Sequence, residues 1–207
     1  MANSADSAGL AKLIVNGSMG NFGIGGSLMV KNPENANTAN AYIEIGENAS
    51  FAAGRVFYIK GTDYGDPSFT SVDDFTGTVV KWNLAEDGSS GMISANGVSA
   101  FECYLVLDFS NVDLSAGASA SSTIAKVDDG GIYGDYIIYA FINDSYVELN
   151  KGGETVIGDV TIDLSSFVTA SSELSYSFSV AAVPEPATCA AVFGALALAF
   201  AAYRRRG

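Results

Sequence analysis

The stretch LIVNGSMGNFGIGGSLMVKN, from Leu13 to Asn32, can be laid over YIEIGENASFAAGRVFYIKG, from Tyr42 to Gly61, at an offset of 29 residues. A fixed offset of this length is typical of an internal repeat. Each copy contains short runs of alternating apolar residues interrupted by glycines, which predicts short strands. Five positions are identical in the two copies: Ile14/Ile43, Gly17/Gly46, Phe22/Phe51, Gly25/Gly54 and Lys31/Lys60.

Strands this short cannot bury an apolar face alone, so we expect successive copies to stack on one another. The sequence therefore predicts an all-β fold, a right-handed parallel β-solenoid (β-helix) with capping strands. Its Gly- and Asn-rich repeats loosely resemble the passenger and adhesin-like β-helices of bacterial surface proteins. The alternative is that two Gly-rich stretches share their composition by chance.

From Val79 onward, runs rich in Val, Ile, Tyr and Phe predict longer strands. The tripeptide Asn143-Asp144-Ser145 is expected to form a tight hairpin turn. We expect the strands to continue the solenoid and cap its end, with a sandwich as the alternative. The expected strands are Val79–Trp82, Phe101–Phe109, Ile132–Ile142, Tyr146–Leu149, Val156–Leu164 and Leu174–Val180.

The chain is expected to divide into three parts: repeats over 1–78, a continuing β domain and cap over 79–182, and a tail over 183–207. The first eleven residues, MANSADSAGLA, lack the basic and apolar regions of a signal peptide. We therefore expect the start to be misassigned within a longer gene, with the repeats truncated at the N-terminus.

Charge and composition exclude several classes of function. The residues before Pro184 hold 22 Asp and Glu against 7 Lys and Arg, a net charge of −15, which disfavours nucleic acid as a partner. The chain has no histidine, so Ser-His-Asp and Cys-His catalysis and His-ligated metal sites are excluded. The two cysteines imply no disulfide framework, and Cys103 is expected to be a small buried hydrophobe. We expect no cofactor and no catalytic residue.

Four carboxylates, Asp63, Asp66, Asp73 and Asp74, lie close together in the sequence GTDYGDPSFTSVDDFT. Their favoured interpretation is a solvated turn, because their spacing matches no calcium loop. A Ca²⁺ site or a glycosidase acid/base pair would use the same residue types. The second hypothesis for the chain is therefore a carbohydrate-active β-helix enzyme that uses Asp and Glu.

The tail VPEPATCAAVFGALALAFAAYRRRG begins at Val183. Ala187 to Tyr203 is apolar apart from Thr188, and 17 residues of helix rise about 25 Å, which predicts a short transmembrane helix over 187–203. A basic cluster after an apolar span stays on the cytoplasmic side of the membrane. Arg204, Arg205 and Arg206 therefore predict a cytoplasmic C-terminus and a β domain outside the cytoplasmic membrane.

Pro184-Glu185-Pro186, the apolar helix and the terminal arginines together resemble the PEP-CTERM sorting signal of exported bacterial proteins. The resemblance implies that a membrane-embedded exosortase reads the tail, cleaves near Pro184-Glu185-Pro186 and passes the protein to the cell surface or the extracellular matrix. We therefore expect a non-enzymatic protein of the cell surface or of a biofilm matrix rich in exopolysaccharide. A plain tail-anchored protein without processing is the third reading.

Overall fold

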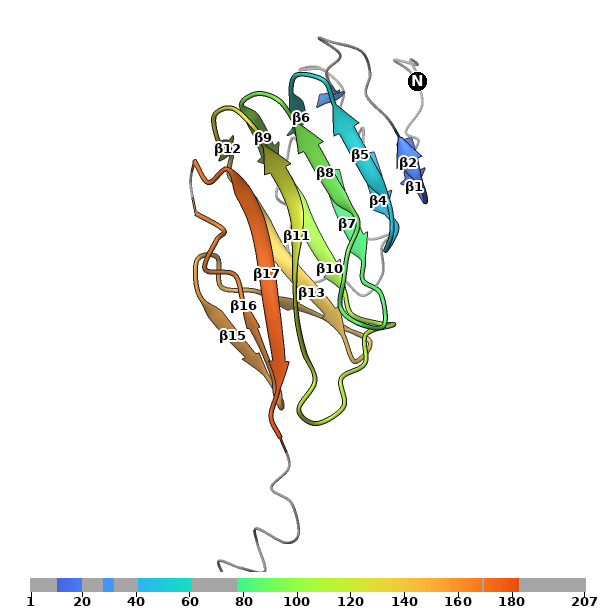
Figure 1. Ribbon diagram of the computed structural model, residues 1–207, viewed down its shortest axis with the longest axis vertical. Coiled ribbons are helices and arrows are strands. Elements are labelled where there is room, and N and C mark those ends of the chain that lie inside the picture. The colour runs from blue at the N-terminus through green and yellow to red at the C-terminus, as the bar shows by residue number, and fades with distance from the viewer. Residues whose placement is uncertain (1–10, 20–27, 32–40, 61–77, 169, 183–207) are drawn as a thin grey trace, which may run out of the picture.

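The computed structural model describes residues 11–19, 28–31, 41–60, 78–168 and 170–182, and within them every regular element is a β-strand (Figure 1). The strands form three sheets, which we name A, B and C. The strands are β1 (Ala11–Val15), β2 (Ser18–Met19), β3 (Leu28–Lys31), β4 (Ala41–Ile45), β5 (Ser50–Ala53), β6 (Phe57–Lys60), β7 (Thr78–Asn83), β8 (Met92–Ala95), β9 (Ser99–Glu102), β10 (Tyr104–Asp108), β11 (Ser119–Val127), β12 (Ile132–Tyr133), β13 (Ile137–Ile142), β14 (Ser145–Glu148), β15 (Glu154–Ile157), β16 (Val160–Asp163) and β17 (Glu173–Val180).

Up to β12, each group of three consecutive strands gives one strand to each sheet, and we call such a group a tier. Sheet A has the order β1-β4-β7-β10-β13-β14, sheet B the order β15-β16-β17-β11-β8-β5-β2, and sheet C the order β12-β9-β6-β3. Strands of successive tiers pair in parallel in all three sheets. The chain therefore passes from A to B to C and returns to A one strand further along.

The expected right-handed parallel β-solenoid with capping strands is wrong. Sheets A and B are mixed, and the described strands form no closed solenoid. In sheet A, Asn143 and Asp144 adopt φ values of 52° and 57°, and this two-residue turn reverses the chain so that β14 pairs antiparallel with β13. In sheet B, β17 pairs antiparallel with β11, and β16 and β15 follow it. The hairpin turn predicted at Asn143-Asp144-Ser145 is confirmed.

The other part of the expected fold, a transmembrane helix over 187–203, lies outside the described residues. Within the part of the chain that the structure describes, no helix has the length and apolar character needed to cross a membrane.

The pairing register corrects the expected offset of 29 residues. Between β3 and β6 the offset holds, because Leu28 lies opposite Phe57 and Lys31 opposite Lys60. Between β1 and β4 it is 30, with Leu13 opposite Ile43. A shift of one residue exchanges the two faces of a strand, so Ile14 lies on the outer face of sheet A and is 46% exposed.

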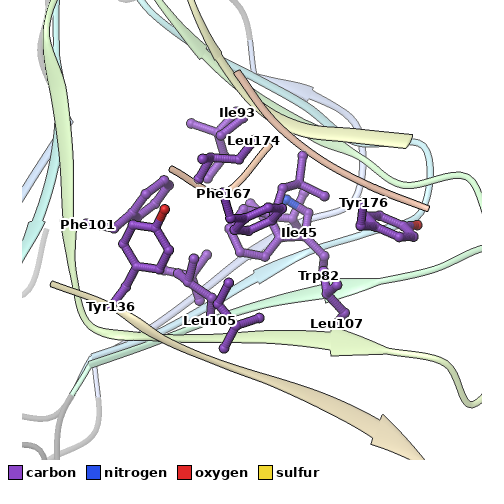
Figure 2. Close-up of a cluster of buried hydrophobic side chains, with 14 of the residues drawn as sticks. Ile45, Trp82, Ile93, Phe101, Leu105, Leu107, Tyr136, Phe167, Leu174 and Tyr176 are labelled. Carbon is purple, nitrogen blue, oxygen red and sulfur yellow. The ribbon is translucent and has the colours of Figure 1, made fainter. Parts of the chain in front are cut away.

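The inner faces of the three sheets meet in one apolar core, part of which Figure 2 shows. Trp82 of sheet A and Phe101 of sheet C are both fully buried and pack edge to face, with ring centroids 6.2 Å apart. Phe101 also stacks on Phe57 of the preceding tier at 4.8 Å, and Tyr176 of sheet B lies in the same core. The tiers β4–β6, β7–β9 and β10–β12 thus each bury inner side chains from all three sheets in this core, which a single short strand could not do.

A second apolar cluster lies on the outer face of sheet A. It consists of Tyr42, Val79, Tyr104, Val106 and Tyr139, each at most 4% exposed. The outer side chains of β10 belong to this cluster and its inner side chains to the main core. The strand is therefore buried on both faces, as its nearly continuous apolar sequence predicts.

Gly134 fixes the corner between β12 in sheet C and β13 in sheet A. Its φ is +119°, and a Cβ atom there would lie 1.7 Å from the backbone oxygen of Phe101. Gly117 has a φ of +87°, but a Cβ atom there would have no other atom within 4 Å. Only glycine therefore fits position 134, for two reasons at once.

We predict that Gly134→Ala lowers the free energy of unfolding by more than about 3 kcal/mol, because it adds a backbone clash to an unfavourable φ. The matched control Gly117→Ala carries only the φ penalty, about 1–2 kcal/mol. Urea unfolding followed by the fluorescence of Trp82 measures both values. Equal losses in the two variants would contradict the described corner.

Candidate functional site

Most outward side chains of β11, β17 and β16 carry a hydroxyl group. In β17, Leu174, Tyr176 and Phe178 point into the core, so the residues between them point outward. The same alternation places the outward residues of β11 and β16. We call these residues the hydroxyl face: Ser119, Ser121 and Thr123 from β11, Ser175, Ser177 and Ser179 from β17, and Thr161 from β16.

The antiparallel register arranges the hydroxyl face in cross-strand rows. Thr161, Ser179 and Ser119 form one row, and Ser177 with Ser121 belongs to the next. Neighbouring strands lie about 5 Å apart and alternate residues of one strand about 7 Å apart, so the hydroxyls form a regular grid. In the third row, Thr123 Oγ1 and Ser175 Oγ are hydrogen bonded at 2.7 Å. A hydroxyl can donate and accept, which suits a ligand that is itself rich in hydroxyls.

The hydroxyl face carries little charge in a strongly acidic chain of net charge −13. Asp163 lies in the row of Ser177, and its two carboxylate oxygens accept hydrogen bonds from the backbone NH and the hydroxyl of Ser165. At one end Lys126 lies opposite Glu173, so their charges offset each other. The face is therefore suited to a neutral ligand more than to a cation or an anion.

A depression of about 420 Å³ borders the hydroxyl face at Ser119. Three carboxylates line it, Glu86, Asp87 and Asp113. Asp87 accepts hydrogen bonds from the hydroxyl and the backbone NH of Ser89, which lower the pKa of this carboxyl. A glycosidase acid needs a raised pKa, so Asp87 is a poor general acid. Within the described residues, no three His, Cys, Asp or Glu side chains gather closely enough to hold a metal ion.

The candidate residues taken from the sequence have different outcomes. Asp63, Asp66, Asp73 and Asp74 lie outside the described residues, and so do Pro184-Glu185-Pro186 and Arg204-Arg205-Arg206. Cys103 is 2% exposed and lies in the main core, as expected. The pKa of its thiol is raised mainly by burial and to a smaller extent by the negative charge of Glu102. Sequence reasoning missed the hydroxyl face because β11 was not expected. Its signal is the alternation Ser119, Ser121, Thr123.

Sheet A carries the most buried ion pair of the described residues, between Lys81 of β7 and Asp108 of β10. Burial alone would raise the pKa of Asp108. Hydrogen bonds from Lys81 and from the hydroxyl and NH of Ser110 outweigh burial, and the pKa lies below its ordinary value of 3.8. This pair closes the edge of the outer apolar cluster and fixes β7 against β10.

No protein-family model, curated protein or solved structure matches the chain.

We predict that Asp108→Asn lowers the free energy of unfolding by about 1–3 kcal/mol at pH 7, because it leaves the Lys81 ammonium without its counter-charge. A carboxyl with a lowered folded pKa contributes stability above its unfolded pKa and loses it as the pH falls below about 4. The difference between variant and parent should therefore shrink from pH 7 to pH 3.

The control is Asp128→Asn, which removes an exposed carboxylate 3.9 Å from Lys126 Nζ. It should change the free energy of unfolding by less than about 0.5 kcal/mol. Urea unfolding of both variants and the parent at several pH values measures the two losses. A pH-independent loss in Asp108→Asn would exclude the ion pair as its cause.

Proposed function

We propose that the chain is an exported, non-enzymatic protein of the cell surface or extracellular matrix, sorted and processed through its C-terminal tail. The observation that carries the proposal is the order of three features at 184–206. Pro184-Glu185-Pro186 comes first, an apolar span over 187–203 follows, and Arg204-Arg205-Arg206 comes last. In this reading the span holds the protein in the membrane with a cytoplasmic C-terminus, and an exosortase-like enzyme is the partner that reads the tail.

The position of the tail relative to the strands supports this proposal. The last strand, β17, ends at Val180, three residues before Val183. It is held on one side by β11 and on the other by β16. A cut near Pro184-Glu185-Pro186 would therefore remove no described strand and no residue of the main core. Processing would leave the described strands and their pairing intact.

The hydroxyl face supports the matrix part of the proposal. A neutral polysaccharide offers hydroxyl donors and acceptors that match the side chains of β11, β17 and β16, and it is not repelled by the acidic charge of the chain. Such a contact needs no catalytic group. The proposed ligand is therefore a neutral exopolysaccharide of the surrounding matrix.

Sorting is tested in cells that lack the exosortase. In its absence the chain should keep its tail, stay in the membrane fraction and show no loss of mass. In its presence, mass spectrometry should find a shorter chain at the surface or in the medium. Identical mass and location with and without the enzyme would refute the proposal.

The tail motif is tested separately with Pro184→Ala and Glu185→Ala. Both should block processing and leave the full-length chain in the membrane fraction, since the apolar span is unchanged. Unaltered processing in both variants would favour cleavage elsewhere. Membrane retention of the parent chain with no shorter product would favour a plain tail anchor.

Polysaccharide binding is tested with Ser177→Glu, which adds a charge in the centre of the hydroxyl face. Loss of one hydrogen bond, about 1 kcal/mol, weakens binding of a neutral exopolysaccharide about fivefold. The control Ser145→Glu adds the same charge to an exposed serine of β14, away from that face. Isothermal titration should find an affinity loss only for Ser177→Glu, and equal affinities would contradict the contact.

A further inference from the structure

Sheet C carries a strip of apolar side chains on its outer face. Phe57, Ile59 and Phe101 belong to the main core, so the residues that alternate with them on β6 and β9 point outward. Two large side chains of this face are exposed, Val98 by 53% and Tyr133 by 41%. We call the following residues the sheet C strip: Tyr58 of β6, Ala100 of β9, Val98 just before β9, and Tyr133 of β12.

The parallel register places the two tyrosines on either side of Ala100. Tyr58 and Tyr133 are both Cα partners of Ala100, and Figure 1 shows β6, β9 and β12 side by side. Each tyrosine is therefore one strand, about 5 Å, from Ala100. Aromatic rings pack with centroids about 4.5–7 Å apart, so a six-membered ring above the small side chain of Ala100 can contact both tyrosines.

The two ends of the strip differ in chemistry. At one end, the hydroxyl of Tyr58 donates a long hydrogen bond of 3.4 Å to Oε1 of Glu102, the next outward residue of β9. A carboxylate accepts several hydrogen bonds, and a tyrosine hydroxyl both donates and accepts. At the other end, Val98 packs against Gly130, where an added Cβ atom would lie 2.6 Å from Val98 Cγ2. The strip therefore joins an apolar surface to hydrogen-bonding groups at one end.

An apolar surface beside hydrogen-bonding groups suits the ring of a neutral sugar. A pyranose with equatorial hydroxyls, such as β-linked glucose, has two flat CH faces and a rim of hydroxyls. The CH faces can pack on the tyrosine rings while rim hydroxyls reach the carboxylate of Glu102 and the hydroxyl of Tyr58. A neutral ring is not repelled by the chain's net charge of −13.

Two other kinds of partner fit the strip less well. A stable protein–protein contact uses about 20–30 residues on each side, many more than the strip provides. An anionic lipid surface attracts clusters of Lys and Arg, whereas the chain is strongly acidic.

We propose that the sheet C strip binds one pyranose ring of a neutral, β-linked glucan. The ring lies above Ala100, its CH faces pack on Tyr58 and Tyr133, and Glu102 accepts a hydrogen bond from a rim hydroxyl. The strip and the hydroxyl face belong to different sheets. The inference therefore requires neither the hydroxyl face nor the tail to act as proposed.

The first test is an amide NMR titration of the 207-residue chain with cellotetraose, a β-linked glucose tetramer, in a detergent without a sugar headgroup. The signals of Ala100 and Tyr133 should shift together with one Kd. Glucitol offers similar hydroxyls without a ring, so at the same concentration of glucose units it should leave both signals in place. No shift with cellotetraose, or an equal shift with glucitol, would overturn the proposal.

The second test uses variants of Tyr133. Tyr133→Ala should weaken cellotetraose binding at least about fivefold, because it removes one stacking face, whereas Tyr133→Phe keeps the ring and should bind within about twofold of the parent. The control Ile14→Ala shortens a side chain of similar exposure, 46%, on sheet A and should leave the affinity unchanged. Parent affinity in Tyr133→Ala, or an equal loss in Tyr133→Phe or Ile14→Ala, would refute stacking on Tyr133.

Ser177→Glu separates the strip from the hydroxyl face. Because this charge lies on sheet B, the cellotetraose shifts of Ala100 and Tyr133 should persist in the variant with an unchanged Kd. Loss of these shifts would contradict an independent site on sheet C.

Discussion

The structure depends on the burial of aromatic side chains where the three sheets meet. Trp82 of sheet A and Phe101 of sheet C are fully buried and pack against each other, and Tyr176 of sheet B lies in the same core. Strands of two to nine residues cannot provide such burial alone, so each tier is stable only with its neighbours. The tight corner at Gly134 and the turn at Asn143-Asp144 are two of the places where the chain changes sheet or direction to keep its apolar residues inside.

The outer faces follow from the same arrangement, and they differ in chemistry. Sheet A carries a buried aromatic cluster bordered by the Lys81–Asp108 ion pair, whereas sheet B carries exposed hydroxyls on β11, β17 and β16. A chain of net charge −13 thus has one nearly neutral, regular surface. The proposed matrix function uses that surface for contact and the tail after β17 for sorting. Neither role requires a catalytic group.

Much of the strand content is predictable from the sequence, and the sheet arrangement is not. The alternation in Ser175–Val180 and the turn at Asn143-Asp144 predict β17 and the β13–β14 hairpin well. The apolar runs 101–109 and 132–142 each predict one strand, but corners at Cys103 and Gly134 divide them between sheets C and A. The Ser-rich strand β11 has too few apolar residues to be recognised, so the three residues that it gives to the hydroxyl face were missed. Pairing partners distant in sequence, such as β11 and β17, leave no local signal.

The described strands through Val180 form one cooperative unit whose stability does not depend on the tail. The chain has a single tryptophan, Trp82, at the centre of the core, so its fluorescence reports on that unit alone. The most direct measurement is urea unfolding of the full chain and of a chain cut after Val183, followed by this fluorescence and by far-ultraviolet circular dichroism. The account predicts one transition, with the same midpoint in both chains and both signals. A lower midpoint in the cut chain, or separate transitions for the two signals, would contradict it.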